Sequence, residues 1–189
     1  YQYKAYKSEA TPPVQQKALN GCILRQLYQH KSTERLKAIA NLYTGAFLFA
    51  MRSCEYLSVG GLPRKMKRLR LRNIRFFKNR KKMAHGHKSL HKCDFISITF
   101  EDQKNAMRND TITMHAADNN LLWPVKSWSR VVKRVLVSNN ASQDSFVNSF
   151  DANGRLHLVT SNDAMRSLRA AATTIGATNL GFNPSKIGT

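Results

Sequence analysis

Acidic residues are scarce in this sequence, and their scarcity is local. The 189 residues include 31 Lys and Arg but only 11 Asp and Glu, which gives a net charge of +20. No acid occurs from Tyr56 through Cys93, and the stretch Arg64–Lys92 within this region carries thirteen Lys and Arg. A surface charged only for solubility would not need such clustering. Clustered cations are typical of proteins that bind nucleic acid and, less often, an anionic membrane.

Cysteine pairs and long apolar runs are also missing. The three cysteines, Cys22, Cys54 and Cys93, form no close pair in the sequence, which argues against a disulfide framework and fits a reducing compartment. The longest apolar candidate, Ala38–Met51, is interrupted by polar residues and predicts a buried helix rather than a membrane span. No signal peptide is recognisable. We therefore expect an intracellular protein without a membrane partner, in the nucleus if the host is eukaryotic.

The apolar periodicity predicts an α+β fold that is mainly helical, with helices around a small three-stranded antiparallel sheet. The expected helices are Val14–His30, Thr33–Ala50, a short turn within Met51–Leu57, Pro124–Val135 and Ser161–Ile175. The expected strands are Arg68–Phe77, Asp94–Phe100 and Thr111–Ala116, of which the last two form a hairpin with its tip at Glu101–Asp110. We assign residues 1–11 to a linker or tail and residues 12–189 to one domain.

An arginine follows the most apolar of the predicted helices. Arg52 is costly to bury there unless it is paired, so the simplest interpretation is that it reaches solvent and pairs with Glu55. Its guanidinium is also suited to clamp a phosphate with two charge-assisted hydrogen bonds. Lys104, at the predicted hairpin tip, has two similar interpretations. It is either a solvated turn lysine or a mobile cation that serves a neighbouring groove as an acid.

The first predicted strand alternates apolar and basic residues. Its apolar positions, Leu69, Leu71, Ile74 and Phe76, predict a core face, and the cations between them predict a face for phosphates. We expect DNA contacts at Arg64, Lys65, Lys67, Arg68, Arg70, Arg72, Arg75, Lys78, Arg80, Lys81 and Lys82.

A cluster of potential metal ligands follows this strand. It consists of His85, His87, His91 and Cys93, with Asp94 beside them. Such side chains can hold zinc, but their spacing matches no known finger pattern. We therefore expect no metal and no cofactor, and we expect the loop to contact phosphates.

Taken in order, these motifs resemble the catalytic domain of tyrosine recombinases, the phage-integrase family, and are closest to integrase-like genes of eukaryotic mobile elements. The resemblance covers the chain from about Pro12 to Thr189. It rests on the apolar helix followed by Arg52-x-x-Glu55-x-Leu57, the basic strand, the hairpin with Lys104, the helix opening Leu122–Val125 and the closing segment Gly181–Thr189.

The resemblance implies an enzyme that breaks and rejoins double-stranded DNA through a 3′-phosphotyrosyl link, without metal or nucleotide cofactor. Arg52 matches the first of the two arginines that stabilise charge on the phosphorane. Lys104 matches the hairpin lysine that protonates the leaving 5′ oxygen. Glu55 matches the acid that supports the first arginine. The family acts in tetramers on two duplexes, which implies a homotetramer of the full-length protein on DNA.

The remaining catalytic groups of the family are absent. None of the six histidines is followed by an arginine three positions later, and no tyrosine follows Tyr56. The chain stops at Thr189, where the missing His-x-x-Arg motif should begin. We therefore interpret residues 12–189 as a partial catalytic domain that lacks its C-terminal part, binds DNA and does not cut it alone.

Two other interpretations stay open. A domesticated element could keep the fold as a non-catalytic DNA-binding protein, and the sequence after Thr189 would distinguish it from a recombinase. An RNA-binding protein would carry aromatic residues within the basic run, on which bases could stack. Only Phe76 and Phe77 are there, and the strand pattern places at least one of them in the core.

Overall fold

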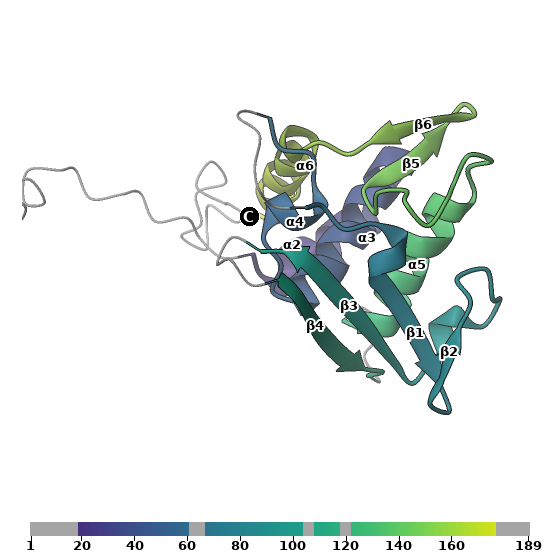
Figure 1. Ribbon diagram of the computed structural model, residues 1–189. Coiled ribbons are helices and arrows are strands. Elements are labelled where there is room, and N and C mark those ends of the chain that lie inside the picture. Colours follow the sequence, from purple (N-terminus) through teal and green to yellow (C-terminus); the bar gives the residue numbers. More distant parts are fainter. Residues whose placement is uncertain (1–18, 61–66, 104–107, 118–121, 177–189) are drawn as a thin grey trace, which may run out of the picture.

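The computed structural model describes residues 19–60, 67–103, 108–117 and 122–176 of the chain (Figure 1). The helices are α2 (Gly21–Gln29), α3 (Glu34–Leu48), α4 (Ser53–Tyr56), α5 (Pro124–Leu136) and α6 (Ser161–Thr174), with the short 3-10 turns η1 (Leu71–Asn73) and η2 (Leu90–Lys92). The strands are β1 (Ile74–Lys78), β2 (Lys81–Met83), β3 (Phe95–Asp102), β4 (Arg108–His115), β5 (Ser149–Ala152) and β6 (Arg155–Leu158).

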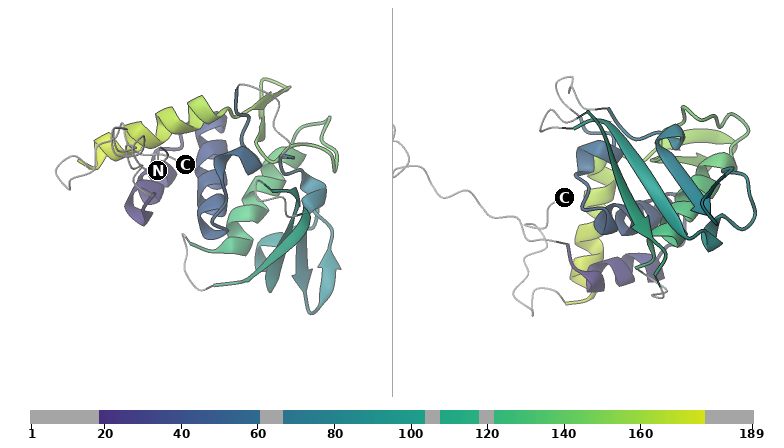
Figure 2. Two further views of the ribbon diagram at one scale, coloured as in Figure 1. Left: turned by 60° about the vertical axis from the view of Figure 1, so that its left-hand side comes forward. Right: turned by 60° about the horizontal axis from the view of Figure 1, so that its bottom comes forward.

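An antiparallel sheet forms one layer of the protein, and helices form the other. Its four strands are arranged in the order β2-β1-β3-β4, and β5 and β6 make a separate hairpin. Helices α3 and α5 lie on one side of the sheet, as the left view of Figure 2 shows. The core lies between these layers, because the side chains of Ile74, Phe76, Ile96 and Ile98 on that face are buried. The opposite face of the sheet carries no described helix (Figures 1 and 2).

The predicted α+β class is confirmed, but the three-stranded sheet is wrong. Lys81–Met83 adds a fourth strand at the edge, and β5 and β6 form a second, two-stranded sheet. The description as mainly helical was also too strong, since six strands stand beside five α-helices in the described residues. The edge strand went unnoticed because two of its three residues are lysines, which hide any alternation of apolar and polar positions.

The first strand is shorter than predicted. It begins at Ile74 rather than Arg68, because Leu71–Asn73 forms a 3-10 turn in which the Asn73 side chain accepts the backbone N–H of Arg70 at 2.8 Å. The apolar alternation still holds in the core, where Leu69, Leu71, Ile74 and Phe76 are at most 2% exposed. Asn73 is therefore the end of a turn and not part of one long strand.

Helix boundaries follow their capping residues. Helix α2 begins at Gly21 because the side chain of Asn20 accepts the N–H of Ile23 at 3.0 Å. The predicted start at Val14 lies outside the described residues. Thr33 caps α3, and Thr160 caps α6 together with Asp163.

Helices α3 and α5 pack unusually closely. Trp128 on α5 is fully buried, and a Cβ atom at Gly45 of α3 would lie 2.9 Å from its indole ring. Only glycine at that position leaves room for the tryptophan. Helix α5 also carries a buried arginine, Arg134. Its guanidinium fixes the helix to its neighbours by donating to the carbonyls of Ser149 (3.1 Å), Ala38 (3.3 Å) and Val147 (2.6 Å). Burial lowers the pKa of the Arg134 guanidinium.

Candidate nucleic-acid interface

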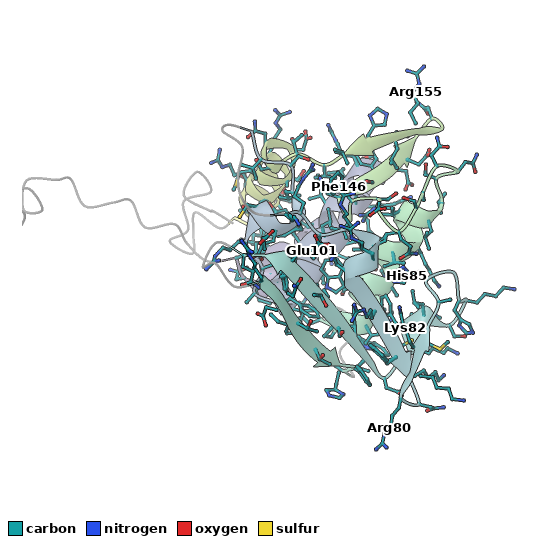
Figure 3. The ribbon with its side chains drawn as sticks, in the orientation of Figure 1. Arg80, Lys82, His85, Glu101, Phe146 and Arg155 are labelled. Atoms are coloured by element: carbon teal, nitrogen blue, oxygen red, sulfur yellow. The ribbon has the colours of Figure 1, made fainter. Side chains whose placement is uncertain are left out.

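The hairpin of β1 and β2 presents a group of cations at its end. Asn79 and Arg80 connect the strands with φ angles of 49° and 62°, and Lys78 pairs with Lys81 across the turn. Two consecutive residues with positive φ are what a two-residue type I′ turn requires, and this turn suits the twist of a hairpin. Figure 3 shows Arg80 pointing away from the body of the protein, with Lys82 on the same hairpin. The fold thus carries these charges out into solvent.

Cations that precede β1 are instead engaged within the fold. The guanidinium groups of Arg68 and Arg70 lie over the ring of Phe146, at 4.0 and 4.5 Å from its centroid. Arg68 also donates to the Ser58 hydroxyl, and Arg70 donates to the backbone carbonyl of Asp144 at 2.9 Å. Partial burial and the neighbouring Arg70 lower the pKa of Arg68. These two arginines hold the loop before β5 against the segment that leads into η1.

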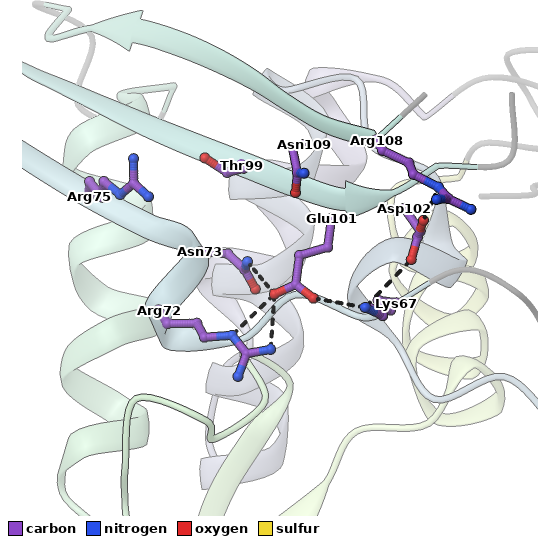
Figure 4. A pocket seen from close by; sticks show the side chains of 9 residues that line it. All are labelled: Lys67, Arg72, Asn73, Arg75, Thr99, Glu101, Asp102, Arg108 and Asn109. Carbon is purple, nitrogen blue, oxygen red and sulfur yellow. Dashed lines mark hydrogen bonds and ion pairs between the residues drawn. The ribbon is translucent and has the colours of Figure 1, made fainter. Parts of the chain in front are cut away.

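A carboxylate next to this segment gathers further cations (Figure 4). Arg72 donates to Glu101 Oε1 from Nε at 3.1 Å and from Nη2 at 3.0 Å, and Asn73 Nδ2 donates to the same oxygen at 3.0 Å. Lys67 Nζ lies 3.6 Å from Glu101 Oε2, and Arg72 also pairs with Asp144. The hydrogen bonds from Asn73 and Arg72 hold the pKa of Glu101 below its ordinary value, so this carboxylate is charged at neutral pH.

Glu101 lies at the centre of a polar hollow of about 680 Å³ at the end of β3 (Figure 4). Its lining consists of four cations (Lys67, Arg72, Arg75 and Arg108), two acids (Glu101 and Asp102), Thr99 and two asparagines (Asn73 and Asn109). The acids are paired, since Arg108 Nε lies 3.3 Å from Asp102 Oδ1. Arg75 has no ion pair with a described acid, so the hollow has an excess of positive charge that an anion can approach.

The predicted DNA contacts therefore divide into two groups. One group is engaged within the fold: Lys67, Arg68, Arg70 and Arg72. The other group takes part in no ion pair among the described residues: Arg75, Lys78, Arg80, Lys81 and Lys82. Arg64 and Lys65 lie outside the described residues.

Arg52 and Glu55 lie at the start of α4, close in sequence but not joined as predicted. Arg52 is exposed, and Glu55 is 5% exposed. The Glu55 carboxylate accepts the backbone N–H of Arg52 at 2.9 Å, and no ion pair of the described residues joins the two side chains. Burial raises the pKa of Glu55, although that bond and the nearby guanidinium oppose the change. Glu55 thus caps α4 and leaves the guanidinium free to point outward.

The segment 67–69 connects α4 to the hollow. The backbone N–H of Leu69 donates to the carbonyl of Glu55 at 2.8 Å, while Lys67 lies 3.6 and 3.7 Å from the carboxylates of Glu101 and Asp102. Lys104 lies outside the described residues, so its predicted role stays a prediction. The strand residues on either side of it, Asp102 and Arg108, pair across β3 and β4 and line the hollow.

A second basic surface was missed from the sequence. Lys126, Arg130 and Lys133 recur along α5 at helical spacing, and desolvation together with Lys133 and Lys92 lowers the pKa of His91 beside them. Each of the three is engaged: Lys126 lies over the Trp123 ring, Arg130 over the Tyr28 ring, and Lys133 donates to the Lys88 carbonyl. The spacing of four and three residues on the predicted helix was the signal that could have revealed it.

The histidines after β2 make separate contacts. His85 Nε2 is 2.8 Å from the Ile74 carbonyl oxygen, and His87 Nδ1 accepts the N–H of Ser89. Over the described ranges, no cluster of His, Cys, Asp or Glu has the arrangement of a metal site. Within the same ranges, every helix is too short or too polar to cross a bilayer.

No family model, curated protein or solved structure matches this chain.

Proposed function

We propose that this chain binds duplex DNA through its backbone phosphates, with the β1–β2 hairpin and the hollow at the opposite end of β1 facing the DNA. One observation carries the proposal: the cations of the hairpin group, Arg75, Lys78, Arg80, Lys81 and Lys82, have no ion pair among the described residues. The described cations before β1 are instead held by acids or, in the case of Arg68, by the Phe146 ring and the Ser58 hydroxyl. Unpaired cations that project from one edge keep their full charge for an external anion. Phosphates along a duplex are such anions, and neutralising them releases condensed counterions.

The proposal is tested by removing charge at two places. A hairpin variant replaces Lys78, Arg80, Lys81 and Lys82 by Gln, and a control variant replaces Lys31, Lys126, Arg130 and Lys133 by Gln. Both lower the net charge from +20 by four. The control cations are held over Tyr28 or Trp123 or bonded to a carbonyl, so their removal tests net charge alone.

Fluorescence anisotropy with a labelled duplex, repeated across a range of salt concentrations, gives the number of phosphate contacts. Each contact contributes about 0.9 to the slope of log K against log salt. The hairpin variant is expected to lower the slope by about 3 and the affinity at least about tenfold, while the control changes the slope by less than about 1. Equal effects of the two variants, or wild-type binding without salt dependence, would contradict the proposed interface.

We also propose that the chain is the front part of a tyrosine-recombinase catalytic domain. Two placements support this. The exposed Arg52 stands at the start of α4, which segment 67–69 connects to the end of β3. The strands β3 and β4 are those that flank Lys104. In such a protein Arg52 would clamp the scissile phosphate, and Lys104 would protonate the leaving oxygen. A homotetramer on DNA, and a nuclear location in a eukaryotic host, belong to the same proposal.

The recombinase assignment has a separate test. This chain alone is expected to form no covalent complex with a suicide DNA substrate, since no tyrosine follows Tyr56. In a chain extended by the expected His-x-x-Arg and tyrosine segments, Arg52→Ala and Lys104→Ala should each reduce cleavage by roughly 10²-fold or more. A 5′-thiol leaving group needs no protonation and should restore cleavage only to the Lys104→Ala variant. If it restores both variants or neither, Lys104 is not the acid. Duplex binding without any cleavage by the extended chain would favour a domesticated, non-catalytic protein.

A further inference from the structure

The outward face of the four-stranded sheet is the face that no described helix covers (Figures 1 and 2). Side chains alternate between the two faces along a strand. The burial of Ile74 and Phe76 places Arg75 and Phe77 on the outward face, and the burial of Ile96 and Ile98 does the same for their neighbours on β3. The hollow around Glu101 opens at one end of this outward face.

A row of ring and cationic side chains crosses the other end of the outward face. Lys82, Phe77, Phe95 and His115 are successive partners across β2, β1, β3 and β4. The rings of Phe77 and Phe95 are stacked, with centroids 4.7 Å apart and planes 13° apart, and the His115 ring lies 5.6 Å from Phe95. Both phenylalanines are only half-buried, and His115 is exposed. Three adjacent rings therefore remain in contact with solvent.

The neighbouring row makes this end of the face complementary to an anion. It consists of Arg75, Ser97 and Thr113, again partners across three strands. In these two rows of described residues there are two cations and no acid. Polar side chains continue along the outward face from these rows toward the hollow. Between the two lie Thr99 and Thr111, whose hydroxyl oxygens are 2.8 Å apart. The distance from Phe95 to Glu101 along β3 is about 20 Å, which is long enough for several nucleotides.

We propose that this row binds an unpaired strand of nucleic acid, with at least one base stacked against Phe77 and Phe95. Lys82, next to Phe77 in the same row, and Arg75, in the neighbouring row, would hold nearby phosphates. An unpaired strand fits better than a duplex, because only an unstacked base can offer its flat face to a protein ring. A protein partner has no need of the two cations beside the rings. The inference goes beyond duplex binding and does not depend on it, because the stacked rings that carry it, Phe77 and Phe95, are not part of the proposed duplex interface. Lys82 and Arg75 are shared by the two proposals, so the ring variants are what separate them.

The first test compares a labelled twelve-residue oligo-dT with a labelled duplex in the same anisotropy assay. Phe77→Leu and Phe95→Leu keep an apolar side chain on the strand, and circular dichroism checks their folding. Each is expected to weaken oligo-dT binding about fivefold or more, and the double variant more, because a stacked base contributes on that scale. Duplex affinity should change less than about twofold. Lys82→Gln should also weaken oligo-dT binding, whereas His157→Ala and Arg155→Gln on the β5–β6 hairpin should leave it unchanged.

A second test needs no substitution. An oligo-dT that carries one 5-iodouracil is irradiated with the wild-type protein, and the cross-linked peptide is sequenced. Cross-links at Phe77, Phe95 or His115 support the inference, and cross-links confined to other rings overturn it.

The outcomes separate this inference from the proposed function. Oligo-dT binding without duplex binding would support the inference and overturn the duplex proposal. Duplex binding without oligo-dT binding would do the opposite. Equal losses on both probes in the Phe77→Leu and Phe95→Leu variants, or no loss on either, would overturn the stacking inference, because the rings would then have only a structural role in the sheet.

Discussion

Glu101→Gln separates the structural role of the hollow from its proposed role in binding DNA. The carboxylate accepts from Arg72 and Asn73 and lies 3.6 Å from Lys67. A glutamine keeps the shape and can still accept from the amide of Asn73, but it no longer attracts the two cations. Stability should therefore fall while affinity for DNA rises.

The two effects can be sized from the contacts. Arg72 is 45% exposed, and it keeps Asp144 as a partner, so the loss of stability should be about 1 kcal/mol, as for exposed ion pairs. Lys67 has Asp102 as its remaining partner at 3.7 Å, and together the released cations add about one phosphate contact. One added contact increases the salt slope by about 0.9, and the affinity at 0.1 M salt by up to about eightfold.

Urea denaturation and duplex anisotropy measure the two effects, with Glu34→Gln as the control. Glu34 pairs with Lys37 on α3, and its charge also raises the pKa of Arg134, but neither group lies in the hollow; its substitution changes net charge by the same amount. The folded state lowers the pKa of Glu101, so the carboxylate stabilises the protein above the unfolded pKa of 4.5, and this contribution disappears as pH falls through the lower, folded pKa. The stability difference between wild type and Glu101→Gln should therefore shrink below pH 4.5. Weaker or unchanged duplex binding by Glu101→Gln, with a normal response of the control, would refute the placement of the hollow against DNA.

Three further predictions concern the framework. Gly45→Ala should destabilise the protein by about 1–3 kcal/mol in urea denaturation, because its Cβ would meet the Trp128 ring at 2.9 Å, while duplex affinity of the folded protein stays unchanged. Arg134→Met should lower stability by about 2 kcal/mol or more, since three carbonyls lose their donor; a smaller loss would mean that water replaces the guanidinium. Arg80→Gly should raise stability by about 0.5–1 kcal/mol, since φ is 62° there, yet weaken duplex binding; a stable variant with full affinity would exclude Arg80 from the interface.

Local patterns predicted much of the framework. The alternation of Leu69, Leu71, Ile74 and Phe76 identified the buried face correctly, although the backbone there is partly a 3-10 turn. The reason is that burial depends on which side of the chain a residue faces, and a short turn preserved that side. The β5–β6 hairpin was missed despite a clear signal, the dipeptide Asn153-Gly154 between two short runs, with φ angles of 55° and 74°.

The candidate site depended on contacts that no local pattern contains. Arg72 meets Glu101 and Asp144, which lie 29 and 72 residues further along the chain. The sequence predicted one uniform basic surface from Arg64 to Lys82, because the acids that pair with these cations belong to other elements of the fold. In the same way, the basic run contains Phe77 but not Phe95, which strand pairing places beside it. Strand pairing therefore supplies a second ring for base stacking that the basic run itself does not contain.

The β1–β2 and β5–β6 hairpins make an internal comparison that bears on Arg80. Both use a two-residue turn that begins with asparagine and has two positive φ angles, but the second residue is glycine at Gly154 and arginine at Arg80. Glycine accepts that conformation without strain, whereas a residue with a Cβ is disfavoured by about 1 kcal/mol. The turn itself therefore does not require arginine, and the fold gives it no ion pair among the described residues. A strained position is best explained by a role outside the fold, and a guanidinium carried to the tip of a basic hairpin is placed to meet a phosphate.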